Sequence, residues 1–69
     1  MMRQPVLLIE VIENAREYED EIRIAKDGDR FYAYVLGLGY TRNYWMSAHQ
    51  LEKDIRDLGF TGTIKVESK

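Results

Sequence analysis

The stretch from Glu21 to Leu36 constrains the fold of this chain more than any other. It reads EIRIAKDGDRFYAYVL, two runs of alternating apolar and polar residues joined by Asp27-Gly28. Asp-Gly between alternating runs predicts a β-hairpin, because a type I′ turn needs positive φ at both central residues. We therefore expect two antiparallel strands with Asp27 and Gly28 at the centre of the turn.

This turn fixes the register of the hairpin and sorts its side chains onto two faces. It places Ile24 opposite Phe31 and Ile22 opposite Ala33. Because strand side chains alternate, one face becomes wholly apolar and consists of Ile22, Ile24, Phe31, Ala33 and Val35. The other face carries Arg23, Ala25, Arg30, Tyr32 and Tyr34. The apolar face has to be buried, so we expect another element to pack across it.

The residues before the hairpin fit two structures. Val6–Glu13 is rich in valine and isoleucine, which favours a strand. Its apolar residues also fit helical spacing, and one long helix from Pro5 to Lys26 is the alternative. We favour the strand, followed by a polar turn at Asn14–Glu17, because the alternation of Glu21–Lys26 is regular.

The stretch Ala48–Leu58 predicts a helix with a signal at each end. Ser47 suits the N-cap and Gln50 completes a capping box, while Met46 and Leu51 have the spacing of a hydrophobic staple. Gly59 follows at the position that favours a left-handed residue. Its neighbour Phe60 is expected to fold back onto Ile55.

Two further strands complete the predicted fold. One is short and aromatic, at Tyr40–Trp45, and the other follows Phe60. The sum is a single α+β domain over residues 1–69, with the order β-β-β-β-α-β. We expect a small antiparallel sheet of four to five strands with one helix packed on one face.

Composition limits the classes of function. The chain has 69 residues, no cysteine, one histidine and a net charge of −2. It therefore lacks thiolate metal ligands and the basic excess of a typical nucleic-acid-binding domain. The lone His49 lies near a helix start, and no phosphate loop or metal motif accompanies it. We expect a cytoplasmic protein without enzymatic activity and without a cofactor or metal.

Acidic residues are concentrated before the hairpin. Six of the twelve acids lie in residues 10–21, namely Glu10, Glu13, Glu17, Glu19, Asp20 and Glu21. On the strand interpretation, alternate members of this run share a face. A row of carboxylates can imitate the phosphates of DNA and steer the protein toward a basic groove.

A second candidate surface is the polar face of the sheet. Its candidate residues are Arg23, Arg30, Tyr32, Tyr34 and Arg42. Tyrosine and arginine together can stack on unpaired bases and bind phosphates, and they are also enriched at protein interfaces. This surface predicts a small module that binds single-stranded nucleic acid, or a protein interface.

Two loose resemblances accompany these surfaces. The element order over roughly residues 21–58 is similar to that of the arm-binding domains of phage integrases. The size, acidity and lack of cysteine resemble those of phage-encoded inhibitors of bacterial defence, including anti-CRISPR proteins. The second resemblance implies a non-enzymatic inhibitor, monomeric or a small homo-oligomer, that blocks a protein with a basic nucleic-acid-binding groove and does not act at a membrane. The alternative is the module that binds single-stranded nucleic acid.

Overall fold

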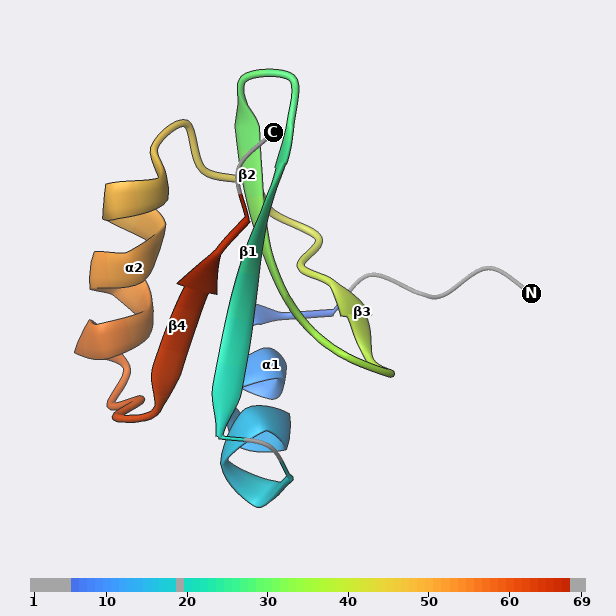
Figure 1. The fold of residues 1–69 in the computed structure, drawn as a ribbon, viewed down its shortest axis with the longest axis vertical. Coiled ribbons are helices and arrows are strands. Elements are labelled where there is room, and N and C mark those ends of the chain that lie inside the picture. The colour runs from blue at the N-terminus through green and yellow to red at the C-terminus, as the bar shows by residue number, and fades with distance from the viewer. Residues whose placement is uncertain (1–5, 19, 68–69) are drawn as a thin grey trace.

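Two helices and a four-stranded sheet make up the fold (Figure 1). The computed structural model describes residues 6–18 and 20–67. The elements are α1 (Leu8–Glu17), β1 (Glu21–Asp27), β2 (Arg30–Val35), β3 (Gly39–Tyr40), α2 (Ala48–Asp57) and β4 (Thr63–Val66). The strand order is β3-β2-β1-β4. The protein is thus α+β, as the sequence predicts, but it has two helices where we expected one.

Helix α1 replaces the predicted strand at Val6–Glu13 and the predicted turn at Asn14–Glu17. The prediction was wrong because it gave too much weight to β-branched residues. Valine or isoleucine costs at most about 0.7 kcal/mol in a helix. Burying such a side chain contributes about 1.5–3 kcal/mol, and Val11, Ile12 and Ala15 are at most 1% exposed.

The long-helix alternative was correct about the type of element but not about its length. Helix α1 ends at Glu17, and β1 begins at Glu21. Between them Asp20 has a φ of +55°, and its N–H donates to the Ala15 carbonyl. This left-handed residue turns the chain out of the helix. Pro5, the predicted first residue of the long helix, lies outside the described residues.

The hairpin of β1 and β2 is confirmed, with a different turn. The two-residue loop is Gly28-Asp29, and Asp27 pairs with Arg30. Only Gly28 has a positive φ, +67°, which is the pattern of a type II′ turn and not of the predicted type I′. The predicted pairing of Ile24 with Phe31 was therefore wrong.

This change shifts the register by two residues, so that Ile24 pairs with Ala33. A shift of two leaves every side chain on its predicted face, because the side-chain period of a strand is two. Ile22, Ile24, Ala33 and Val35 are at most 3% exposed. The predicted apolar face is confirmed.

Strand β3 is shorter than the predicted strand Tyr40–Trp45. After Tyr40 the Thr41 N–H still donates to the Ala33 carbonyl, and Thr41 forms a bridge with Val6. The chain then leaves the sheet and rejoins it at Trp45, which exchanges two backbone hydrogen bonds with Phe31. Thr41 lies at the point of departure. Its hydroxyl accepts a hydrogen bond from the Ala33 N–H and donates one to the Asn43 carbonyl. This buried side chain supplies hydrogen bonds where the regular ladder is interrupted.

Helix α2 begins and ends close to where the sequence predicts. Ser47 Oγ accepts the Gln50 N–H at 3.4 Å, whereas the Gln50 amide donates to Asp54 and does not complete the capping box. At the other end Gly59 has a φ of +98°, and the N–H groups of Gly59 and Phe60 donate to carbonyls in the last turn. This is a Schellman motif. Met46 is 63% exposed, so the predicted staple does not bury it.

Strand β4 makes the sheet mixed, where we predicted an antiparallel one. It lies at the edge and runs parallel to β1, with Ile64 beside Ile22. Two antiparallel pairings make β3 run in the same direction as β1. The α2 crossover then returns the chain to the opposite edge in that same direction, as a helix connection between parallel strands does.

A single core joins both helices to one face of the sheet. Its buried members are Val11, Ile12 and Ala15 of α1, Leu51 and Ile55 of α2, Phe60, and Ile22, Ile24, Ala33 and Val35 of the sheet. Since both helices contribute to this one cluster, they cover the same face, and within residues 6–18 and 20–67 no helix lies over the opposite face of the sheet.

Candidate functional site

The face of the sheet away from the helices carries a cluster of tyrosines. Its members, here called the tyrosine face, are Tyr32 and Tyr34 of β2, Tyr40 of β3, Tyr44, and Arg30. The strand period places Tyr32 and Tyr34 there, and the pairing of β3 with β2 places Tyr40 beside Tyr34.

The rings of the tyrosine face contact one another in a chain. The Tyr34 and Tyr40 centroids are 4.7 Å apart, Tyr32 and Tyr40 are 6.4 Å apart with perpendicular planes, and Tyr32 and Tyr44 are 6.3 Å apart. The Arg30 guanidinium lies 4.4 Å from the centre of the Tyr44 ring. Tyr40 and Tyr44 remain 49% and 46% exposed, so this preformed aromatic surface is open to solvent.

Charged side chains surround one end of the cluster. The Tyr34 hydroxyl donates to Glu67 at 2.7 Å, and Arg23 lies 3.8 Å from the same carboxylate and 3.1 Å from Glu21. Burial, and then the hydrogen bond to Glu67, raise the pKa of Tyr34 to about 12. This tyrosine is therefore a neutral donor at physiological pH.

A shallow hollow lies beside the rings. It is lined by Ala25, Lys26, Asp27, Tyr32 and Tyr40. Ala25 faces Tyr32 across the β1–β2 pairing and has a small side chain. The hollow adds a concave feature to the tyrosine face.

The structure brings together most of the predicted sheet-face residues. Arg23, Arg30, Tyr32 and Tyr34 share the open face, while Arg42 is exposed in the segment between Tyr40 and Tyr44. The candidate set omitted Tyr40 and Tyr44, although the sequence contains the signal: they continue the aromatic residues that begin in β2.

The predicted acidic residues are divided among several elements. Glu21 lies in β1 and pairs with Arg23, while Asp20 occupies the turn after α1, where its carbonyl accepts the Thr63 N–H at 2.9 Å. Glu19 lies outside the described residues. The predicted alternation along a strand was wrong for Glu17, which belongs to a helix.

Three of the acids nevertheless lie on one side of α1. Glu10, Glu13 and Glu17 line a shallow hollow together with Asn14, Tyr18 and Leu38. Glu10 also accepts the Leu7 N–H at 2.8 Å and so caps the helix. Within residues 6–18 and 20–67, neither Glu13 nor Glu17 has a basic side chain as an ion-pair partner.

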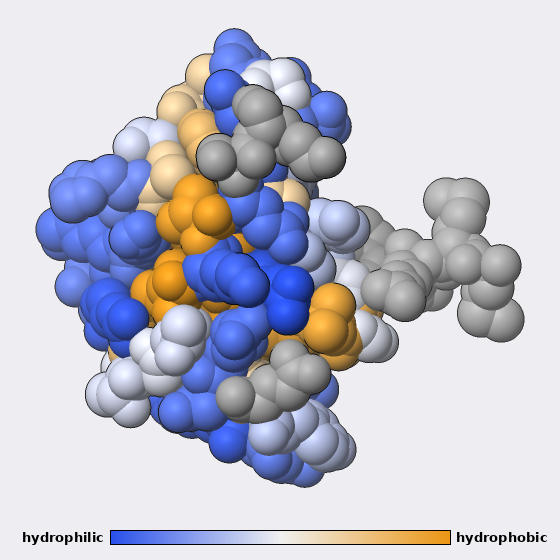
Figure 2. Space-filling view, in the orientation of Figure 1, coloured by the Kyte–Doolittle hydropathy of each residue, from blue (hydrophilic) through white to orange (hydrophobic). Residues whose placement is uncertain are grey.

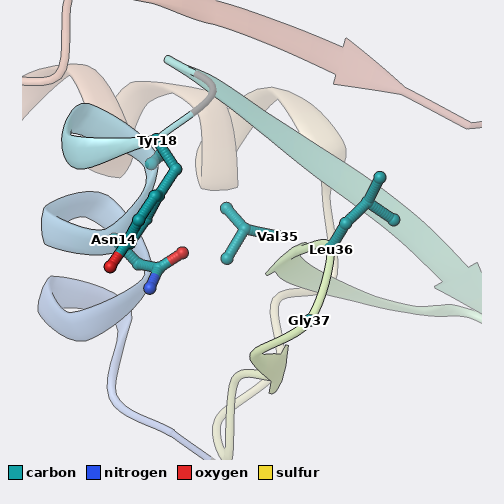
Figure 3. A pocket seen from close by; sticks show the side chains of 6 residues that line it. Asn14, Tyr18, Val35, Leu36 and Gly37 are labelled. Carbon is teal, nitrogen blue, oxygen red and sulfur yellow. The ribbon is translucent and has the colours of Figure 1, made fainter.

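Another hollow adjoins the one lined by Glu10, Glu13 and Glu17. It lies between α1 and the turn after β2, and is lined by Asn14, Ala15, Tyr18, Val35, Leu36 and Gly37. Figure 3 shows Asn14 and Tyr18 on α1 with the Val35 side chain between them and the turn, while the Leu36 side chain points away. Asn14 and Tyr18 belong to both hollows.

Other kinds of site are less developed in the described part of the chain. His49 is exposed on α2, beside Glu52, Lys53 and Arg56. Within residues 6–18 and 20–67 no three acidic or histidine side chains are grouped as a metal site would require. No helix in that part of the chain has the length and apolar composition needed to cross a membrane. Figure 2 shows a largely hydrophilic side of the molecule with apolar residues in separate patches.

The chain matches no protein-family model, no curated protein and no solved structure.

Proposed function

We propose that this is a non-enzymatic interaction protein that binds a protein partner through its tyrosine face. The observation that carries the proposal is the chain of four tyrosines, each ring beside the next, with Arg30 stacked at its end. Tyrosine and arginine dominate the energetics of protein interfaces, because they combine a large contact area with polar groups. The rings are already packed, so binding orders few side chains.

Charge favours a protein over a nucleic acid as the partner. Three cations, Arg23, Arg30 and Lys65, and three carboxylates, Glu21, Asp27 and Glu67, lie on this face by register or contact. These charges balance, and Arg23 lies close to both Glu21 and Glu67. Binding of single-stranded nucleic acid relies on a groove that neutralises several phosphates.

Quantitative affinity capture from bacterial lysate tests this proposal. The variant is Arg30→Ala with Tyr44→Ala, and the matched control is Arg16→Ala with Tyr18→Ala, the same residue types on α1. We expect one lysate protein to be enriched equally by the wild type and the control and to be lost by the variant. Once purified, that protein should bind the wild type directly.

Two results contradict the proposal. One is equal capture by the Arg30→Ala, Tyr44→Ala variant, whose fold is checked by circular dichroism. The other is salt-dependent binding of a dT20 or rU20 oligonucleotide that this variant abolishes, which assigns the face to single-stranded nucleic acid.

A second candidate is the inhibitor whose acidic surface imitates nucleic acid. The observation that favours it is the placement of Glu10, Glu13 and Glu17 on one side of α1. Glu13 and Glu17, which have no ion-pair partner within residues 6–18 and 20–67, lie one turn apart and would attract a basic groove by long-range electrostatics.

Charge reversal tests this second function. We expect the wild type to capture a nucleic-acid-binding protein that duplex DNA displaces. The variant with Glu13→Lys and Glu17→Lys should no longer capture that protein. Asp29→Lys with Glu52→Lys reverses two carboxylates elsewhere and should leave capture intact. Capture that survives reversal at Glu13 and Glu17 excludes the acidic side of α1 as the contact.

A further inference from the structure

We infer that the hollow on the tyrosine face binds a proline-rich segment of the protein partner in the polyproline II conformation, an inference that rests on the proposed function. It names the chemistry of the segment that the partner presents. Three properties of the face select this occupant: the shape of the hollow, the hydroxyl donors beside it and the balance of charge around it.

Two tyrosine rings and an alanine shape the hollow. The centroids of Tyr32 and Tyr40 are 6.4 Å apart and their planes meet at 87°, so the rings form a corner and not a flat stack. Ala25, which pairs with Tyr32, also lines the hollow. Apolar atoms make up most of the exposed surface of this hollow, unlike the two hollows along α1. An aromatic corner of this kind suits the compact apolar ring of proline.

The hydroxyl groups near the hollow are available as donors. Tyr40 and Tyr44 are about half exposed, and within residues 6–18 and 20–67 neither hydroxyl hydrogen-bonds to another protein group. A polyproline II segment has no internal hydrogen bonds, so its carbonyls are free to accept. The carbonyls of an α-helix are used within the helix. An ordinary strand also carries N–H groups that need acceptors, whereas proline has none.

The charges of the tyrosine face favour a neutral occupant. Its cations and carboxylates balance, and Arg23 lies 3.1 Å from Glu21 and 3.8 Å from Glu67. A charged segment would compete with these contacts, whereas a neutral segment leaves them intact. The fixed φ of proline also lowers the conformational entropy that binding costs. A proline-rich segment combines the apolar rings, the free carbonyls and the absence of charge that this face selects.

The test uses two neutral peptides and the whole protein. The first peptide consists of ten prolines and forms a polyproline II helix. The second has the same length and alternates glycine with serine, so it keeps the carbonyls but lacks the rings and the rigidity. Each peptide is titrated into the protein, and two-dimensional NMR spectra give both the affinity and the location of the amide shifts.

We expect the proline peptide to bind roughly tenfold more tightly than the glycine–serine peptide and to shift the amides of residues 25–27, 32 and 40. Ala25→Leu fills the hollow, keeps every tyrosine and should weaken binding roughly fivefold or more. Tyr40→Ala should have a similar effect, and Tyr40→Phe, which removes only the donor, a smaller one. Tyr18→Ala, at an exposed position on the other side of the sheet, is the matched control and should leave binding unchanged.

Four results overturn the inference: no binding of the proline peptide at millimolar concentration, amide shifts away from the hollow, equal affinity for both peptides, or binding that Ala25→Leu leaves unchanged. Suppose that the proline peptide fails while the Arg30→Ala, Tyr44→Ala variant still loses the captured protein. The proposed function then stands, and only the proline-rich segment is rejected. The two failures are thus distinguishable.

Discussion

The two helices of this protein have equal length and cover the same face of the sheet, yet their ends are formed differently. Helix α2 has Ser47 at its N-cap and Gly59 at the left-handed position after its end. Helix α1 begins at Leu8, and its N-cap Leu7 has no side-chain acceptor; the Glu10 carboxylate accepts the Leu7 N–H. After α1 the left-handed position belongs to Asp20, not to a glycine.

The information that defines the two helices lies at different distances along the chain. Local residues define both ends of α2, so its bounds can be read from neighbouring positions in the sequence. The end of α1 depends on a distant segment, because the Asp20 carbonyl binds the Thr63 N–H and Gly62 packs against Asp20. Helix α1 is therefore defined by tertiary contacts.

The largest effects should come from the core, where the two helices are alike. Ile12→Ala in α1 and Leu51→Ala in α2 remove side chains that are fully buried. Each is expected to lower the free energy of unfolding by about 2–5 kcal/mol, measured by urea denaturation. A cost below about 1 kcal/mol for Ile12→Ala would contradict the dependence of α1 on burial.

The next effect concerns the contact that ends α1. A Cβ at Gly62 would overlap the Asp20 carbonyl oxygen, so Gly62→Ala should cost about 1–3 kcal/mol. Hydrogen exchange should accelerate at the amides of residues 20 and 63. Gly28→Ala is the control, because nothing lies near its added Cβ and its strain stays in the hairpin turn. Unchanged hydrogen exchange at residue 63 would mean that the start of β4 does not depend on the contact that ends α1.

The caps should show the contrast between the helices directly. Ser47→Ala removes the acceptor for the Gln50 N–H and should cost about 0.5–2 kcal/mol in urea denaturation. Glu10→Gln keeps an acceptor for the Leu7 N–H and loses only charge at the helix start, so about 0.3–1 kcal/mol is expected. A larger cost for Glu10→Gln would reverse the comparison and make α1 the helix that depends on its cap.

The smallest effect concerns β4, the edge strand that follows α2. The Tyr34 hydroxyl donates to Glu67 just beyond β4, and the pKa of Tyr34 is raised to about 12. The unfolded chain ionises this tyrosine near pH 10, so its contribution to stability is present below pH 10 and is lost as pH rises toward 12.

Absorbance titration at 295 nm measures this directly. The difference in absorbance between wild type and Tyr34→Phe should change with a midpoint near pH 12. Tyr44→Phe, at an exposed position, serves as the control. A difference curve centred at pH 10 would mean that the contact with Glu67 does not hold Tyr34 in solution.

The elements that could be predicted from the sequence are those whose signals are local. The alternation of residues 21–36 defined the hairpin and its apolar face, because a strand period of two survives a register shift of two. The residues around Ser47 and Gly59 defined α2, because capping hydrogen bonds join positions only a few residues apart. The sheet-face candidates followed from the same alternation, and the ring contacts add Tyr40 and Tyr44 to them.

The remaining features depend on the tertiary structure. It made residues 8–17 a helix, because burial of one apolar stripe against the sheet outweighs the weak strand preference of valine and isoleucine. It placed β4 parallel to β1, since the direction of an edge strand depends on the path of the crossover. It also arranged Glu10, Glu13 and Glu17 along a helix, where their spacing follows the helical turn and not the strand period.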